Sequence, residues 1–268
     1  MMPRGEPRTL WVDTDRFALY REGPSLLLQA SGRAPTRVPL SRVSRAVIQG
    51  HHHSAGVLDA CLALAASGAV VHFPGTAERP SIRLQPEQAP TNDVAAEVAD
   101  LISQHSGLGP FNWWADCQRR HAWSLVFARS FQGDFAAART RLHQYLQRIG
   151  PGHYFAHEVD ALEMNLRQWL AAELHRSGWI SVAQILSARG ARMEQVLHEC
   201  LYIPLLWRFT GWRRQQAYAL PERERVRFFE LETVGRLSEQ LHRHLRALAR
   251  EYHVSWRRQL ADPESSDG

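Results

Sequence analysis

The sequence predicts an α+β fold, in which a small β-rich domain (hairpins or a β-sandwich with one helix) precedes an all-helical domain. Between Thr9 and Gln85, short apolar runs alternate with turn residues at roughly ten-residue spacing, which is typical of a small β-sheet module. Residues 86–92 contain two prolines among polar residues, and beyond them apolar residues recur at helical spacing. We therefore expect a β-rich domain at 1–85, a linker at 86–92, a helical domain at 93–261 and a disordered tail at 262–268.

The β-rich part is expected to place its strands on the short apolar runs, at 9–12, 17–20, 25–29, 37–40, 46–48, 69–73 and 81–84. One helix interrupts them from Ala55 to Ala66. Ser54 is a suitable N-cap for this helix, and Gly68 is a suitable stop.

The second half is expected to form helices at 92–104, 112–131, 134–149, 153–176, 182–189, 191–210 and about 221–260. In the last of these, opposite charges recur three or four residues apart, as in Glu224–Arg227 and Glu232–Arg236. Such pairs favour a long helix with a solvated face.

Composition indicates a globular protein and is compatible with a nucleic-acid partner. The chain has 268 residues, is 44% hydrophobic and carries a formal charge of +5, with all of its 32 basic residues being Arg. Arginine binds phosphate in a bidentate manner, so this balance, with nine tryptophans, fits a nucleic-acid partner without requiring one. Three widely spaced cysteines, no signal peptide and no apolar run of about 20 residues indicate a cytoplasmic protein with no membrane segment.

Glu163 is the most unusual residue of the helix expected at 153–176. At about 100° per residue it falls within the apolar stripe of that helix, between Val159 and Leu166. A carboxylate in that position is costly unless it is compensated. One alternative is an ion pair with Arg167, four residues on. The other is a functional role, either as a metal ligand or as an acid–base group that faces a cavity. Glu158 points the opposite way and is expected to be solvated.

Other polar clusters have competing interpretations. The stretch from Trp207 to Gln216 interleaves aromatic residues with arginine, which suits phosphate contact and base stacking, or else a helix end with buried tryptophan and solvated arginine. The candidate DNA-binding residues are Arg208, Trp212, Arg213, Arg214, Arg257 and Arg258. The run His51-His52-His53 is expected to be a polar loop, and His153 and His157 have a spacing that only weakly indicates metal binding.

Several motifs in order resemble the family of CRISPR-associated protein one, the CRISPR adaptation integrase. Val38 to Gly50 resembles the family's strand motif i-P-L-x-x-I-x-x-V-V-l-x-G, and Ser67 to Phe73 resembles its motif x-G-i-x-V-x-F. The expected hairpins from Leu10 to Leu28 resemble the family's opening. In the helical half, Glu163 to Trp169 resembles the family's E-G-x-A-A-R-x-Y helix, with Met164 at the glycine position.

The resemblance implies the family's activity, which is metal-dependent insertion of short DNA fragments into a repeat array for antiviral defence, together with endonuclease (hydrolase) activity. It implies a homodimer that works with duplex DNA and a small adaptation partner protein. It also implies that Glu163 is a catalytic ligand for Mg²⁺ or Mn²⁺. The family's metal-binding His would fall near Tyr218, and no His occurs between His198 and His242. Phe229 to Arg236 resembles a degenerate form of the family's D-L-x-E-x-F-R acidic motif, and this resemblance implies Glu230 and Glu232 as further candidate ligands.

Three hypotheses follow for the chain. It is a divergent integrase with a metal held by Glu163 and by Glu230 or Glu232. Alternatively, it is a catalytically impaired relative that binds DNA or completes an adaptation complex. The third alternative, which sets the resemblance aside, is a helical protein-interaction module.

Overall fold

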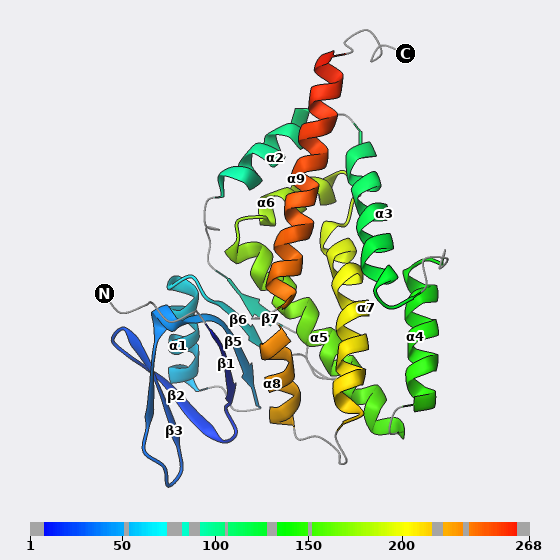
Figure 1. Cartoon of the computed structure of the whole chain (residues 1–268). Coiled ribbons are helices and arrows are strands. Elements are labelled where there is room, and N and C mark those ends of the chain that lie inside the picture. Colours follow the sequence, from blue (N-terminus) through cyan, green and yellow to red (C-terminus); the bar gives the residue numbers. More distant parts are fainter. Residues whose placement is uncertain are drawn as a thin grey trace, which may run out of the picture. The chain divides into compact units, whose positions relative to one another are not determined.

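The structure is a computed structural model that describes residues 8–50, 54–73, 82–85, 92–104, 107–127, 133–149, 152–215, 222–232 and 236–261. The predicted linker lies outside these ranges except for Asn92, and His51-His52-His53 and the predicted tail at 262–268 lie wholly outside them. The chain divides into two compact units, an N-terminal unit (1–90 with 172–177) and a helical unit (91–171 with 178–268). The predicted α+β class is confirmed, with strands in the first unit and helices in the second (Figure 1).

The N-terminal unit contains two sheets and one helix (Figure 1). The first sheet has the order β1-β5-β6-β7, and the second has the order β2-β3-β4. The bounds are β1 Arg8–Asp13, β2 Phe17–Glu22, β3 Ser25–Ala30, β4 Thr36–Pro39, β5 Val43–Gln49, α1 Ala55–Ala66, β6 Val70–Phe73 and β7 Ile82–Leu84.

Strand pairing corrects one sequence expectation. β2, β3 and β4 form the expected antiparallel hairpins, but β1 does not join them. Instead β1 pairs in parallel with β5, with Leu10 opposite Ala46, and β5 pairs in parallel with β6. Parallel neighbours need a long crossover, which β2–β4 supply between β1 and β5, and α1 between β5 and β6.

One apolar core joins both sheets and α1. It includes Val12, Leu19, Leu26, Ile48 and Leu64, each at most 2% exposed. Alternate positions on the strands, such as Ala46 and Ile48 on β5, point to this core.

The helical unit is built from α2 Asp93–Gln104, α3 Gly109–Ser124, α4 Phe135–Ile149, α5 Gly152–Arg176, α6 Ile180–Ala188, α7 Met193–Arg213, α8 Glu222–Glu232 and α9 Ser238–Ala261. The last turn of α5 belongs to the N-terminal unit. Two expectations were wrong. The helix at 112–131 ends at Ser124, because a turn follows it, and the long helix at 221–260 is divided into α8 and α9. None of the helices in the described ranges is long and apolar enough to cross a membrane.

Helices α3, α7 and α9 pack together at the centre of this unit (Figure 1). Two buried tryptophans of α3 fix the arrangement through their indole N–H groups. Trp114 donates to the backbone oxygen of His244 on α9 at 3.0 Å, and Trp123 donates to that of Glu199 on α7 at 3.2 Å. Because a buried indole N–H requires an acceptor, these bonds specify which surfaces meet.

Candidate functional site

Glu163 lies where the helical periodicity predicts. It is 8% exposed, and its stripe neighbours Val159, Leu166 and Leu170 are each at most 2% exposed. The side chain therefore projects into the interior of the helical unit. A carboxylate in such a position has to be compensated by charged or hydrogen-bonding partners.

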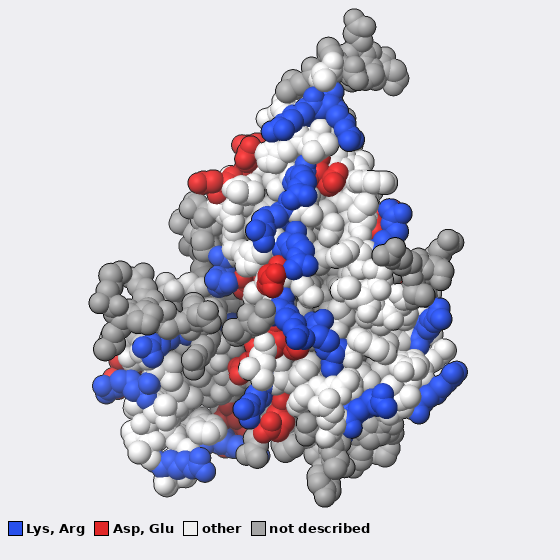
Figure 2. Space-filling view, in the orientation of Figure 1, with Lys and Arg blue, Asp and Glu red and all other residues white. Residues whose placement is uncertain are grey.

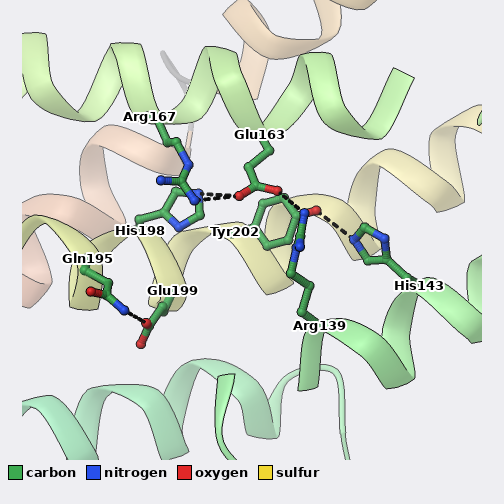
Figure 3. A network of polar contacts seen from close by, with 8 residues as sticks. All are labelled: Arg139, His143, Glu163, Arg167, Gln195, His198, Glu199 and Tyr202. Atoms are coloured by element: carbon green, nitrogen blue, oxygen red, sulfur yellow. Dashed lines mark hydrogen bonds and ion pairs between the residues drawn. The ribbon is translucent and has the colours of Figure 1, made fainter. Parts of the chain in front are cut away.

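Two guanidinium groups supply that compensation (Figure 3). Arg167 donates to Oε1 of Glu163 at 2.8 Å, which confirms the ion pair expected from the i,i+4 spacing. Arg139 of α4 donates to Oε2 at 2.8 Å. No sequence pattern pointed to Arg139, because its contact with Glu163 depends on how α4 packs and not on spacing along one helix.

A second layer of polar aromatic residues adjoins the carboxylate (Figure 3). The Nε2 atom of His198 on α7 lies 3.7 Å from Oε1 of Glu163, and it has no hydrogen-bond partner among the described residues. The His198 ring stacks on Tyr202, with centroids 5.4 Å apart. The Tyr202 hydroxyl in turn hydrogen-bonds with Nε2 of His143 at 2.9 Å. The network thus joins α4, α5 and α7.

The charges of this network are set by burial and by the arginines. Burial alone would raise the pKa of Glu163, but the hydrogen bond from Arg167 and the charge of Arg139 outweigh it and hold the pKa below its usual value. Burial is the main cause that lowers the pKa of His198 to about 4. The positive charge of Arg167 also lowers this pKa, and the negative charge of Glu163 acts in the opposite direction. At neutral pH the site therefore holds one carboxylate, two guanidinium cations and a neutral imidazole.

This set of groups does not fit Mg²⁺ or Mn²⁺. Both ions prefer several oxygen ligands of negative charge, whereas the two oxygens of Glu163 already accept hydrogen bonds from cations. Among the residues that the structure describes, no group of three or more His, Cys, Asp or Glu side chains is placed to hold a metal ion. As a further metal ligand beside Glu163, His198 would contribute a single neutral nitrogen.

Glu230 and Glu232 are not brought into a metal cluster with Glu163. Both lie on α8. The carboxylate of Glu232 accepts from Arg208 at 2.8 Å and lies 3.6 Å from Arg236, so its charge is used in ion pairs. The carboxylates of Glu163 and Glu232 are thus both engaged by arginines, and a metal held by Glu163 with Glu230 or Glu232 stays a prediction.

Glu158 corrects a further expectation. It is 3% exposed, not solvated, and its Oε2 accepts from Nε of Arg213 at 2.9 Å. Arg213 is equally buried. A single apolar stripe on α5 predicts one buried face, whereas the C-terminal end of α7 covers the opposite side as well.

The candidate DNA-binding residues separate into two groups. Arg208 and Arg213 use their guanidinium groups in ion pairs with Glu232 and Glu158, and Trp212 stacks on Phe228 with centroids 4.8 Å apart. These contacts match the alternative of a packed helix end, except that the arginines are paired and not solvated. The second group, Arg214, Arg257 and Arg258, is exposed.

A cavity of about 690 Å³ adjoins the Glu163 network. Arg167 and His198 line it, together with Met193 and Gln195 from the first turn of α7. The cavity leaves the edge of the network accessible to small molecules, although Glu163 itself does not line it.

Comparison with known proteins establishes the fold. No protein-family model matches the sequence, and no curated protein is significantly similar to it. Solved structures are similar. TtCas1 in complex with DNA aligns with a TM-score of 0.57 and 14% sequence identity over 91% of each chain. TtCas1 alone aligns with a TM-score of 0.57 and 14% sequence identity over 92% of this chain and 99% of that chain. A CAS1 protein from Thermotoga maritima aligns with a TM-score of 0.56 and 11% sequence identity over 90% of this chain and 97% of that chain. The chain has the Cas1 fold, as the motif order predicts.

Proposed function

We propose that this chain is a DNA-binding Cas1-type protein of CRISPR adaptation that has no metal-dependent active site at Glu163. The observation that carries the proposal is the pairing of both Glu163 oxygens with guanidinium groups in a chain that has the Cas1 fold. Glu163 occupies the position of the family's metal ligand in the E-G-x-A-A-R-x-Y motif, but its negative charge serves to hold Arg139 and Arg167.

Electrostatics explains why this pairing opposes a divalent cation. A metal ion at the carboxylate would lie within a few ångströms of two positive charges, which repel it in the low dielectric of a half-buried site. Displacing either arginine would leave that guanidinium without its partner. The network is therefore more stable as a set of ion pairs within the chain than as a metal site.

DNA remains the best-supported partner. One of the similar structures is a TtCas1–DNA complex, and this chain has a positive formal charge carried entirely by arginine. Arginines that contact phosphates release counterions, so affinity should depend steeply on salt. By the same resemblance, the chain acts as a homodimer with a small adaptation partner protein and captures short duplex fragments for a repeat array.

Two measurements on the purified full chain test the proposal. Binding of a fluorescent duplex should be detectable at low salt and weaken as salt rises. Strand transfer or nicking in the presence of Mg²⁺ or Mn²⁺ should be absent in the wild type and unchanged in Glu163→Ala. If the wild type does not bind DNA at any salt concentration, the proposed function is wrong.

A metal-dependent integrase is the second candidate function. The observation that favours it is the approach of His198 to Glu163 at 3.7 Å, beside an accessible cavity. The same assay decides between the two. Metal-dependent strand transfer that disappears in Glu163→Ala would establish the integrase and exclude the non-catalytic role.

A further inference from the structure

The helix α9 has one apolar face and one basic face. Leu241, Leu245, Leu248 and Tyr252 are each at most 1% exposed, so the inner face is fixed in the core of the helical unit. The outer face is arginine-rich. Because the inner face is packed along most of the helix, the outer arginines project from a rigid support.

Four of these arginines make no ion pair with any residue that the structure describes. Arg243 is paired with Glu239 at 2.9 Å, which neutralises its charge. By contrast, no ion pair within the described residues involves Arg246, Arg250, Arg257 or Arg258, all of which are exposed. Free exposed cations on one helix indicate a surface that meets negative charge in another molecule.

Three of the four arginines are arranged in a row, and Arg258 lies beside this row on the outer side of the helix. Figure 2 shows basic side chains following α9 along its length on the outward face. Arg246, Arg250 and Arg257 are spaced by four and seven residues, which keeps them on one side of the helix. From Arg246 to Arg257 the helix rises roughly 16 Å, which equals about five base-pair steps along a duplex axis at about 3.4 Å each.

We infer that the outer face of α9, made of Arg246, Arg250, Arg257 and Arg258, binds the sugar–phosphate backbone of duplex DNA. This inference rests on the proposed function and assigns its contact surface. These guanidinium groups make no ion pair within the described residues, and they therefore suit backbone phosphates better than a particular base sequence. This face takes the role of DNA contact that the sequence suggested for Arg208 and Arg213, which are held in ion pairs within the helical unit.

The test measures the salt dependence of duplex binding for three versions of the full chain. The variant R246A/R250A/R257A/R258A removes the face. The control R33A/R42A/R148A/R192A removes the same charge from four exposed arginines on other parts of the chain. The third version replaces the four α9 arginines by lysine, which keeps the charge and removes the bidentate geometry. Thermal unfolding of each version checks that the fold is retained.

In the wild type, four phosphate contacts contribute about 3–4 to the slope of log affinity against log salt, because each releases about 0.9 counterion. The alanine variant should lose most of that slope and bind at least about 100-fold more weakly at 50 mM salt. The control and the lysine variant should retain most of the slope. A duplex with a changed base sequence should bind equally well.

The outcomes separate the inference from the proposed function. If the wild type binds duplex DNA and the α9 alanine variant binds with the same slope as the control, α9 is not the contact surface, although the DNA-binding role stands. Loss of binding in the control equal to that in the α9 variant would also overturn the inference, because net charge and not this face would then determine affinity. If the wild type does not bind duplex DNA, both the α9 inference and the proposed function are wrong.

Discussion

Glu163 keeps its charge inside the helical unit because its two oxygens have separate cationic partners. Arg167 comes from the same helix and is 63% exposed at its side chain, whereas Arg139 comes from α4 and is 42% exposed. The carboxylate itself is 11% exposed. Most of the desolvation cost therefore falls on Glu163, and the arginines offset it while their own outer atoms remain in water.

Replacing Glu163 by glutamine should measure the structural value of this network. We expect Glu163→Gln to lower the free energy of unfolding by about 2 kcal/mol, because a charge-assisted bond to each arginine is lost at a buried site. Glu239→Gln is the matched control, since Glu239 also pairs with an arginine four residues on but is 65% exposed. Its effect should stay below about 0.5 kcal/mol.

Urea denaturation at pH 7 gives both values. Equal effects of the two substitutions would mean that burial adds nothing to the Glu163 contacts. A gain in stability of the wild type on adding Mn²⁺, lost in Glu163→Gln, would contradict the network and indicate a metal site.

Only part of this site was predictable from the sequence. Arg167 was found because contacts four residues apart follow from helix geometry. Arg139 and His198 were not assigned to Glu163, because their proximity depends on the packing of α4 and α7. Glu158 was assigned to solvent because one apolar stripe was taken to define the only buried face of α5.

At the scale of elements, the Glu158–Arg213 pair joins α5 to the end of α7. Both side chains are 3% exposed, so neither charge can be hydrated if the other is removed. We expect Glu158→Gln to lower the free energy of unfolding by about 3–5 kcal/mol, since it removes the negative charge that faces the buried guanidinium of Arg213.

A double substitution distinguishes loss of the pair from loss of packing. Glu158→Leu combined with Arg213→Met replaces the two charges by apolar groups of similar volume, and it should recover most of the stability lost in Glu158→Gln. The measurement is the denaturation midpoint of the wild type and both variants. If the double variant is less stable than Glu158→Gln, the charged pair contributes more than its desolvation costs.

The position of most elements was predictable, but their pairing and division were not. Apolar runs and turn residues located the strands, yet the parallel pairing of β1 with β5 depends on contacts between segments about 35 residues apart. The charge pattern from Glu222 to Arg258 is continuous, so it gave no reason to separate α8 from α9. Periodicity reports which face of a helix is apolar and does not by itself report where the chain changes direction.

At the scale of the whole molecule, the Cas1 fold and the chemistry at Glu163 are separable. The order of short apolar motifs predicted the fold, because apolar patterning determines which layers form a core. The charges around Glu163 were set by a few side chains, such as Arg139, that can vary without altering that patterning. A shared fold therefore predicts the architecture and leaves the reaction to the site.

Buried histidines in both units make the stability of the whole chain depend on pH. Burial lowers the pKa values of His72, His198 and His244 to about 4. Neighbouring positive charges contribute, with Arg45 and Arg83 acting on His72, and His121 and Arg243 acting on His244. Below pH 6.5 the unfolded chain binds protons at these positions that the folded chain does not.

Stability should therefore fall as pH decreases from about 6.5 towards 4, because the unfolded state gains the protons. Each histidine contributes a slope of up to about 1.4 kcal/mol per pH unit in that window. His244→Asn should reduce the slope by about one proton, since it removes a titrating group whose Nδ1 lies 2.8 Å from Gln118. His242→Asn is the control, because His242 lies two residues earlier on α9 and is exposed. Denaturation monitored by tryptophan fluorescence between pH 4 and 8 measures these slopes, and the same slope in both variants would show that His244 titrates normally in the folded protein.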